Sequence, residues 1–273
     1  MNKVCTPLLD TLSRRAKRFV DVRRSGHREK LRAYRDSYKG CRAFVIGNGP
    51  SVRIEDLELL QNEVTFCCNR FHLAYPLIEF RPSHTVIADS LMLENFGSEI
   101  AANCDSDLMV GSAYLPQNLK GNFSWIRLRN RAPFQFNFDI TGPVSPGGSV
   151  IVVALQAAFY MGIREIYLYG VDHDFSFLRQ TMETDLVSGE GNHFIANYRS
   201  GKSWHPPDVV EIEKALATCR SFYEAQGGRI LNMTRAGKLN VFERASFDQI
   251  TSGASTHSEG ASTSTTSTRR DLL

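Results

Sequence analysis

Short apolar runs alternate with longer apolar or amphipathic stretches along this 273-residue chain. Each short run is bounded by glycine or polar residues, a pattern that predicts buried β-strands. These runs occupy residues 42–46, 64–68, 84–88, 165–170 and 229–234. The longer stretches at 150–161 and 209–226 predict helices. The alternation therefore predicts one Rossmann-like α/β domain with a largely parallel sheet and helices on both faces.

A glycine-rich turn follows the first predicted strand, with the sequence Gly47-Asn48-Gly49-Pro50-Ser51. Glycine tolerates a sharp turn and carries no Cβ, so bare backbone N–H groups can approach a ligand there. Proline suits the first turn of a helix, and the serine hydroxyl can cap that helix or bind phosphate. The spacing matches neither the GxGxxG fingerprint nor a P-loop. A tight strand-to-helix turn without a ligand is therefore the alternative.

Polar residues also follow the other predicted strands. They are Asn69, Asp89, Asp172, His173, Asn232 and Thr234. In open parallel sheets the carboxyl ends of the strands form the edge where ligands bind, so we expect these side chains to converge. For the last two residues, a satisfied turn without a ligand is the alternative.

Two segments between the strands are harder to interpret. Phe134, Phe136 and Phe138 alternate along the chain, which favours one face of a strand over the lining of an acceptor pocket. Residues 173–208 are rich in charge, glycine and aromatic side chains. A loop of this length in a compact domain is usually functional or disordered, and the aromatic content predicts an active-site insertion.

Five stretches together resemble known families. They are Val45–Ser51, Cys68–Phe71, Gly148–Ser149, Met161–Asp172 and Asn192–Phe194. Their combination resembles bacterial proteins with the MptE-like domain, also catalogued as domain of unknown function 115, over about residues 40–248. More distantly, it is similar to the sialyltransferases of glycosyltransferase family 42, which share the GNGPS turn and the CN(Q/R)F element. The resemblance implies a GT-A-type variant of the Rossmann-like fold, with the insertion at about 173–208 as a lid over the donor.

The two relatives imply different reactions. The sialyltransferases use a CMP-activated nonulosonic acid without a metal, which implies a glycosyltransferase of bacterial surface polysaccharide or glycolipid synthesis. The MptE enzymes transfer pyrophosphate from Mg-ATP to 6-hydroxymethylpterin, so a diphosphokinase using Mg²⁺ is the alternative. A nucleotide-binding module without catalysis is the second alternative. We prefer the glycosyltransferase, with a glycan or glycolipid acceptor and no permanently bound cofactor.

The resemblance also implies roles for individual residues. Asn48, Ser51 and Asn69 match the sialyltransferase positions that surround the cytidine and phosphate, and Ser149 lies near a matching serine. The expected nucleotide-binding residues are Gly47, Asn48, Gly49, Pro50, Ser51, Asn69, Asp89, Gly148, Ser149, Asn232 and Thr234.

Two positions depart from the sialyltransferase pattern. Asp89 stands where those enzymes carry an asparagine, and it can bind a ribose hydroxyl or, with Asp172, a Mg²⁺ ion. The sialyltransferase histidine falls opposite Asn197. His193 is therefore the expected base, because the unperturbed pKa of histidine suits proton transfer near neutrality. Asp172 and His173 are the next candidates.

Charge is concentrated near the N-terminus. The chain has a net charge of +3, but residues 1–39 carry twelve Lys or Arg against four acidic residues. This predicts a basic helical arm that either contacts an anionic membrane face or packs against the domain as a solvated helix. The arm lacks interleaved aromatic residues, so no nucleic-acid binding is expected. The Ser/Thr-rich tail at 249–273 is expected to be disordered.

Composition limits the remaining classes. The 42% of hydrophobic residues suffices for one core, and six cysteines without metal-ligand spacing predict reduced thiols. No apolar run reaches the roughly 18 residues of a membrane span, and the first residues lack a signal-peptide core. We therefore expect a cytoplasmic protein, with peripheral contact of the basic arm with the inner membrane face as the alternative to a solvated helix packed against the domain.

Overall fold

The computed structural model describes residues 24–175, 190 and 193–252. Much of the predicted basic arm, part of the insertion at 173–208 and nearly all of the predicted tail lie outside these described residues. The predictions for those parts stay predictions.

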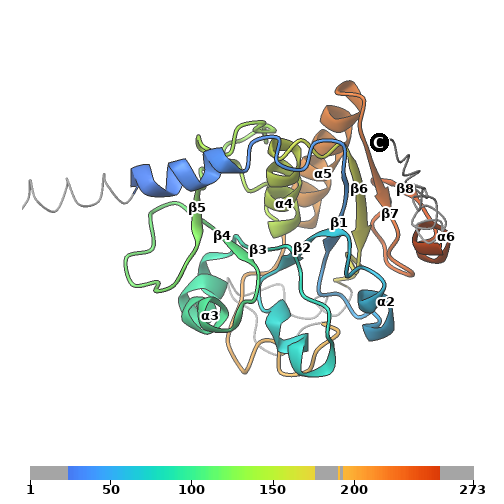
Figure 1. Ribbon diagram of the computed structural model, residues 1–273, viewed down its shortest axis with the longest axis horizontal. Coiled ribbons are helices and arrows are strands. Elements are labelled where there is room, and N and C mark those ends of the chain that lie inside the picture. The colour runs from blue at the N-terminus through green and yellow to red at the C-terminus, as the bar shows by residue number, and fades with distance from the viewer. Residues whose placement is uncertain (1–23, 176–189, 191–192, 253–273) are drawn as a thin grey trace, which may run out of the picture.

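The described residues form an eight-stranded sheet in which all neighbouring strands are parallel. The strands are β1 (Arg42–Ile46), β2 (Val64–Cys68), β3 (His84–Ile87), β4 (Asp107–Ser112), β5 (Ser124–Arg127), β6 (Glu165–Tyr169), β7 (Arg229–Asn232) and β8 (Glu243–Arg244). Their spatial order is β5-β4-β3-β2-β1-β6-β7-β8 (Figure 1). The predicted α/β fold with a largely parallel sheet is confirmed.

Helices cover both faces of this sheet (Figure 1). They are α2 (Ile54–Glu58), the 3₁₀ helix η1 (Phe71–Leu77), α3 (Ser90–Asn103), α4 (Val150–Tyr160), α5 (Val209–Ala225) and α6 (Phe247–Ser252), preceded by a helix at residues 24–33. The helix at 24–33, α4 and α5 pack on one face, whereas α2, η1, α3 and α6 pack on the other.

The side chains of β1 show why both faces need covering. Ala43 and Val45 point into one core, and Phe44 and Ile46 point into the other, because successive side chains of a strand alternate. A parallel sheet buried on both faces reads as a continuous apolar run, which is the pattern that predicted these strands. Residues 151–160 of α4 are all buried as well, which accounts for its apolar sequence.

The chain reverses direction across the sheet next to β1. From β1 it proceeds outward through β2, β3, β4 and β5, then returns through α4 to β6 on the opposite side of β1. The next helices along the chain after β1 and β6, α2 and α5, therefore lie on opposite faces of the sheet. In open α/β sheets, this topological switch point forms the crevice in which ligands bind.

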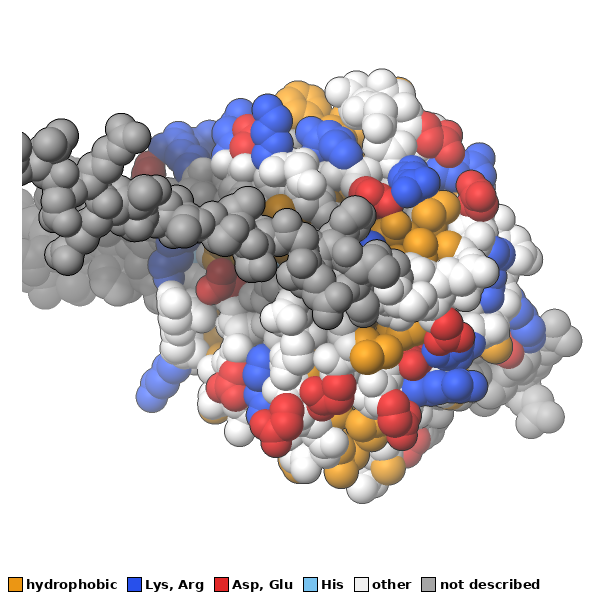
Figure 2. Space-filling view, turned by 45° about the vertical axis from the view of Figure 1, so that its right-hand side comes forward, with side chains coloured by type: hydrophobic (Ala, Val, Ile, Leu, Met, Phe, Trp, Pro, Cys, Tyr) orange, Lys and Arg blue, Asp and Glu red, His pale blue; other side chains and the backbone are white. Residues whose placement is uncertain are grey.

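The described part of the N-terminal arm packs against the domain. Leu31 is buried in the core next to α4, and His27 stacks on Phe123 with ring centroids 4.8 Å apart. Lys30 donates a 2.6 Å hydrogen bond from Nζ to Asn122. Figure 2 shows basic and acidic side chains interspersed over one face of the described residues. None of the described helices is long and apolar enough to cross a membrane.

The aromatic residues at 134–138 form no strand. This segment is irregular; Phe134 and Phe136 pack against the same core, and Phe134 also lines the cavity described below. Phe136 stacks on Phe222 at a centroid distance of 4.2 Å, whereas Phe138 is 66% exposed. The expected single face of a strand is therefore wrong, because the segment has no sheet neighbour to impose alternation.

Candidate functional site

The glycine turn after β1 lies against the loop after β6. Gly47 N donates to Tyr169 O at 2.8 Å, and Gly49 N donates to Gly170 O at 2.9 Å. A Cβ on Gly47 would lie 2.3 Å from Gly170 O, and a Cβ on Gly49 would lie 1.8 Å from Asp172 Oδ2. Both glycines are thus needed because two loops approach closely. Their N–H groups, which we expected to face a ligand, already bond to the backbone of β6 and its loop.

Ser51 positions the carboxylate of Asp172. Its Oγ donates to Asp172 Oδ2 at 2.7 Å, and Lys238 N donates to Asp172 O at 2.7 Å. Pro50 and Ser51 do not line the cavity described below, whereas Asp172 does. Ser51 therefore contacts the candidate site through Asp172.

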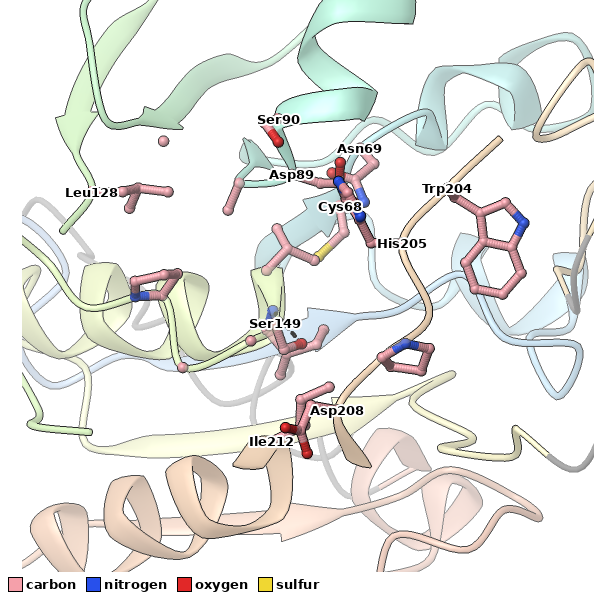
Figure 3. A pocket seen from close by; sticks show the side chains of 18 of the residues that line it. Cys68, Asn69, Asp89, Ser90, Leu128, Ser149, Trp204, His205, Asp208 and Ile212 are labelled. Atoms are coloured by element: carbon pink, nitrogen blue, oxygen red, sulfur yellow. Dashed lines mark hydrogen bonds between the residues drawn. The ribbon is translucent and has the colours of Figure 1, made fainter. Parts of the chain in front are cut away.

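A cavity of about 1370 Å³ opens over the carboxyl edge of the sheet. Among the predicted site residues, it is lined by Gly47, Asn48, Gly49, Asn69, Asp89, Gly148, Ser149, Asp172, His173 and His193. Figure 3 shows Asn69 and Asp89 on one side of the cavity, with Ser149 and Asp208 on the opposite side. The structure therefore brings together residues from the ends of four strands, although they lie far apart in the sequence.

Two asparagines present buried acceptors to this cavity. Asn48 Nδ2 donates to Cys68 O at 2.9 Å and to Tyr198 Oη at 3.1 Å. Because a carbonyl only accepts hydrogen bonds, the amide nitrogen must lie on that side. Asn48 Oδ1 and Asn69 Oδ1 are both buried and have no hydrogen-bond partner among the described residues. Such oxygens would be satisfied by donors of a ligand, such as sugar hydroxyls or an amino group.

Two helices begin at the edge of the cavity. Asp89 caps α3 by accepting a 2.9 Å hydrogen bond from Met92 N to Oδ1. Ser149 caps α4 by accepting a 3.3 Å hydrogen bond from Ile151 N to Oγ. Helix N-termini carry partial positive charge and favour anions. The start of α4 faces the cavity through Gly148 and Ser149, so it can stabilise a phosphate there.

His193, the expected base, lines the cavity. Its ring stacks on Tyr198 at a centroid distance of 3.8 Å, and its Nδ1 lies 2.9 Å from Glu190 O. Since the carbonyl can only accept, Nδ1 carries the proton and Nε2 is left as an acceptor. Burial, followed by the charge of Arg199, lowers the pKa of His193 to about 4. The ring is therefore neutral at pH 7 and can accept a proton, but this low pKa makes it a weaker base than a histidine with the unperturbed pKa on which the sequence expectation rested.

The other sequence candidates lie in different surroundings. His173 Nε2 lies 3.2 Å from Glu213 Oε1 of α5, although the residue lines the cavity. Asn232 Nδ2 donates to Leu239 O at 3.0 Å, and Thr234 Oγ1 accepts from Val171 N at 3.1 Å. Thr234 thus holds the loop after β6, whereas Asn232 holds the segment after β7, and neither lines the cavity.

Sequence reasoning missed the far end of the cavity, beyond β4 and β5. Tyr114 is 80% exposed there, and Arg127, Arg129 and Arg131 line the same end. The signal was the alternation of arginines at 127, 129 and 131, at the carboxyl end of β5 and thus at the same edge as the other site residues. Among the residues that the structure describes, no group of three or more His, Cys, Asp or Glu side chains is arranged to hold a metal ion.

No protein-family model and no curated protein matches the sequence. Among solved structures, the fold is similar to the MAf glycosyltransferase from Magnetospirillum magneticum AMB-1, with a TM-score of 0.50 and 15% identity. This similarity covers 82% of the chain but only 38% of that glycosyltransferase.

Two weaker similarities are to sialyltransferases from Campylobacter jejuni. CstII, in complex with the substrate analogue CMP-3FNeuAc, has a TM-score of 0.39 at 16% identity, over 75% of this chain and 85% of that chain. The monofunctional alpha-2,3-sialyltransferase Cst-I has a TM-score of 0.42 at 15% identity, over 76% and 80%. At these identities the comparisons concern the fold, and the MptE-like assignment stays a prediction.

Proposed function

We propose that the protein is a nucleotide-dependent glycosyltransferase that uses a CMP-activated nonulosonic acid and a glycan or glycolipid acceptor. One observation carries this proposal: the loops after β1 and β6 meet at the switch point of a parallel sheet, directly at a cavity of about 1370 Å³. The fold shared with the MAf glycosyltransferase is consistent with it. The choice of CMP rests on the sequence motifs that resemble sialyltransferases.

The nucleotide would bind between the loop after β2 and the start of α4. Asn48 and Asn69 line the cavity, and their buried Oδ1 atoms, which have no partner among the described residues, would accept from ribose hydroxyls or the amino group of cytosine. The start of α4, with Ser149, supplies partial positive charge for the phosphate. Preorganised groups of this kind stabilise the charge that develops on the leaving nucleotide.

The proposed reaction is a displacement at the anomeric carbon of the sugar. The acceptor hydroxyl oxygen forms a bond to that carbon, the bond from the carbon to the phosphate oxygen breaks, and CMP leaves with the electron pair. The hydroxyl proton passes to His193 Nε2, which the hydrogen bond at Nδ1 leaves as the acceptor. Asp172, held by Ser51, would orient the ribose or the acceptor.

The acceptor would enter from the end of the cavity beyond β4 and β5. The exposed ring of Tyr114 offers an apolar face for a sugar ring, and the arginines at 127, 129 and 131 offer hydrogen-bond donors. This end is lined by different strands from those next to the glycine turn. Donor and acceptor could therefore occupy the cavity together.

A diphosphokinase using Mg-ATP is the second candidate, because Asp89 and Asp172 both line the cavity. Mg²⁺ is commonly bound by one or two carboxylates together with phosphate oxygens, so these two side chains would fit the ion. Each has one oxygen engaged, with Met92 N and Ser51 Oγ respectively. The bound ion would neutralise the phosphates of ATP.

Thermal unfolding with CMP, UDP, GDP, ADP and ATP, each with Mg²⁺ and with EDTA, tests these candidates. A ligand at about 100 times its Kd raises the free energy of unfolding by about 2.7 kcal/mol. Selective stabilisation by CMP that is insensitive to EDTA is the expected result. Selective stabilisation by ATP that requires Mg²⁺ would favour the diphosphokinase, and no stabilisation by any of the five would overturn both proposals.

A further inference from the structure

Arg199 lies in the wall of the cavity with an unusual set of neighbours. Its guanidinium carbon lies 4.8 Å from the ring centroid of Trp204 and 5.8 Å from that of Tyr198. Its Nε is buried and has no hydrogen-bond partner in the part of the chain that the structure describes. Among the described residues, its guanidinium forms no ion pair with a carboxylate. The cation therefore stacks on aromatic rings, with the charges of Asp89 and Glu190 nearby but not paired with it.

Partial burial of the Arg199 guanidinium costs free energy when no anion is bound. Burial lowers the pKa of Arg199, and the neighbouring Tyr198, Asp89 and Glu190 only partly oppose that shift. A guanidinium remains charged in proteins, so its lost hydration must be replaced by hydrogen bonds or charge. Stacking on aromatic rings contributes about 0.5–2 kcal/mol, and it leaves the buried Nε donor without an acceptor among the described residues. An oxyanion in the cavity would accept from these donors.

The position of Arg199 is held from its backbone. Arg70, which is only 5% exposed, donates from Nη1 to Tyr198 O and to Ser200 Oγ. The same guanidinium bonds to Glu99 Oε1 of α3 at 2.6 Å through Nη2. Arg199 N itself donates to Glu190 Oε2 at 3.1 Å. The segment that carries Arg199 is thus pinned to the domain on both sides, and the cation is preorganised.

The cation also lies close to the proposed nucleotide site. Tyr198, the preceding residue, bonds through Oη to Asn48 Nδ2 of the glycine turn at 3.1 Å. Asp89, whose charge acts on Arg199, caps α3 at the same edge of the cavity. A ligand bound at the glycine turn can therefore reach the guanidinium.

We propose that Arg199, stacked on Trp204, is the anion-binding residue of the cavity and takes an oxyanion of the nucleotide-sugar donor. The oxyanion is either the nucleotide phosphate or the carboxylate of a nonulosonic acid. This inference rests on the proposed function for the identity of the ligand. It rests on the geometry of Arg199 alone for the charge of the ligand.

The test measures binding of CMP, cytidine, N-acetylneuraminic acid and inorganic pyrophosphate by titration calorimetry, in wild type, Arg199→Met and Arg199→Lys. Loss of charge-assisted hydrogen bonds predicts that Arg199→Met binds CMP at least about tenfold more weakly. Cytidine, which has no phosphate, should bind both proteins equally. Arg199→Lys keeps the charge but loses the planar stack and fork, so it should fall between the two. Arg32→Met, an exposed arginine away from the cavity, is the matched control.

The unliganded proteins provide a second readout. Because Arg199 is a half-buried cation that pairs with no carboxylate among the described residues, Arg199→Met should leave the unliganded protein as stable as wild type or more stable. Removal of an arginine with only a structural role would instead lower the stability of the unliganded protein. A lower unfolding temperature of unliganded Arg199→Met, with unchanged CMP affinity, would overturn the inference.

The four probes separate the sources of the anion and the two proposals. A loss for CMP assigns Arg199 to the phosphate, and a loss for N-acetylneuraminic acid alone assigns it to the carboxylate. If CMP, N-acetylneuraminic acid and pyrophosphate each bind equally to wild type and to both Arg199 variants, the anion-binding role is refuted while the proposed function stands. If CMP fails to bind wild type but pyrophosphate binds through Arg199, the anion site stands and the proposed donor is wrong. If no probe binds wild type, both are refuted.

Discussion

Replacing Gly49 with alanine should damage the candidate site by steric overlap alone. The added Cβ would lie 1.8 Å from Asp172 Oδ2 and 2.8 Å from Gly170 O, whereas real Cβ contacts essentially never fall below 3.0 Å. Asp172 must therefore move by more than an ångström, which breaks its 2.7 Å hydrogen bond with Ser51. Overpacking of this kind costs about 1–3 kcal/mol. For a domain of this size, each kcal/mol lowers the unfolding temperature by about 2–4 °C.

Gly26→Ala is the matched control for this substitution. Gly26 lies exposed in the helix at 24–33, and a Cβ there would meet nothing within 4 Å. Alanine is the better helix former, so this change should stabilise the protein by about 0.5–1 kcal/mol. Thermal unfolding with and without CMP measures both effects. A Gly49→Ala protein with the wild-type unfolding temperature and unchanged stabilisation by CMP would refute the close approach of the two loops.

Other residues give independent predictions. Burial lowers the pKa of His84 to about 4 in the folded protein, whereas it is about 6.5 in the unfolded chain. Between about pH 4 and 6.5 the unfolded chain therefore binds more protons than the folded protein, and the free energy of unfolding falls as pH falls. His84→Phe should remove about 3 kcal/mol of this pH dependence, measured by urea unfolding across that range; an unchanged slope would contradict the pKa shift. Ser51→Ala removes the hydroxyl bonded to Asp172 and should cost about 0.5–1.5 kcal/mol in the same assay, whereas a neutral effect would argue against that bond. In Arg70→Lys, the lysine side chain cannot reach all partners of the guanidinium, so the backbone amides of residues 197–200 should exchange hydrogen faster than in wild type. Equal exchange would show that Arg70 does not anchor this segment.

The fold was predictable because its signals are local. Each inner strand is an apolar run bounded by glycine or polar residues, since both faces of the sheet are buried. Residues 151–160 of α4 are apolar apart from Gln156 because the helix is buried on every side. Even the edge of the sheet that carries the site followed from polar residues placed after strands, because parallel strands all end at one edge.

The details of the site depend on contacts between distant segments, which no local pattern encodes. Gly49 was expected to expose its N–H to a ligand, but this N–H bonds to Gly170, which lies far along the chain. Arg199 became a candidate only because Trp204 stacks on it and Arg70 pins its segment. The segment at 134–138 lacked a sheet neighbour, and alternation in sequence cannot reveal that absence.

A crystal structure of the protein with CMP is the most direct test of the proposed site. We predict that the nucleotide lies between the loops after β1 and β2, which carry Asn48 and Asn69, and the start of α4. Its sugar or base should donate to Asn48 Oδ1 or Asn69 Oδ1, and its phosphate should lie near Ser149 and Arg199. CMP bound outside this cavity, or in it without contact to either asparagine, would contradict the proposed nucleotide site at the junction of β1 and β6.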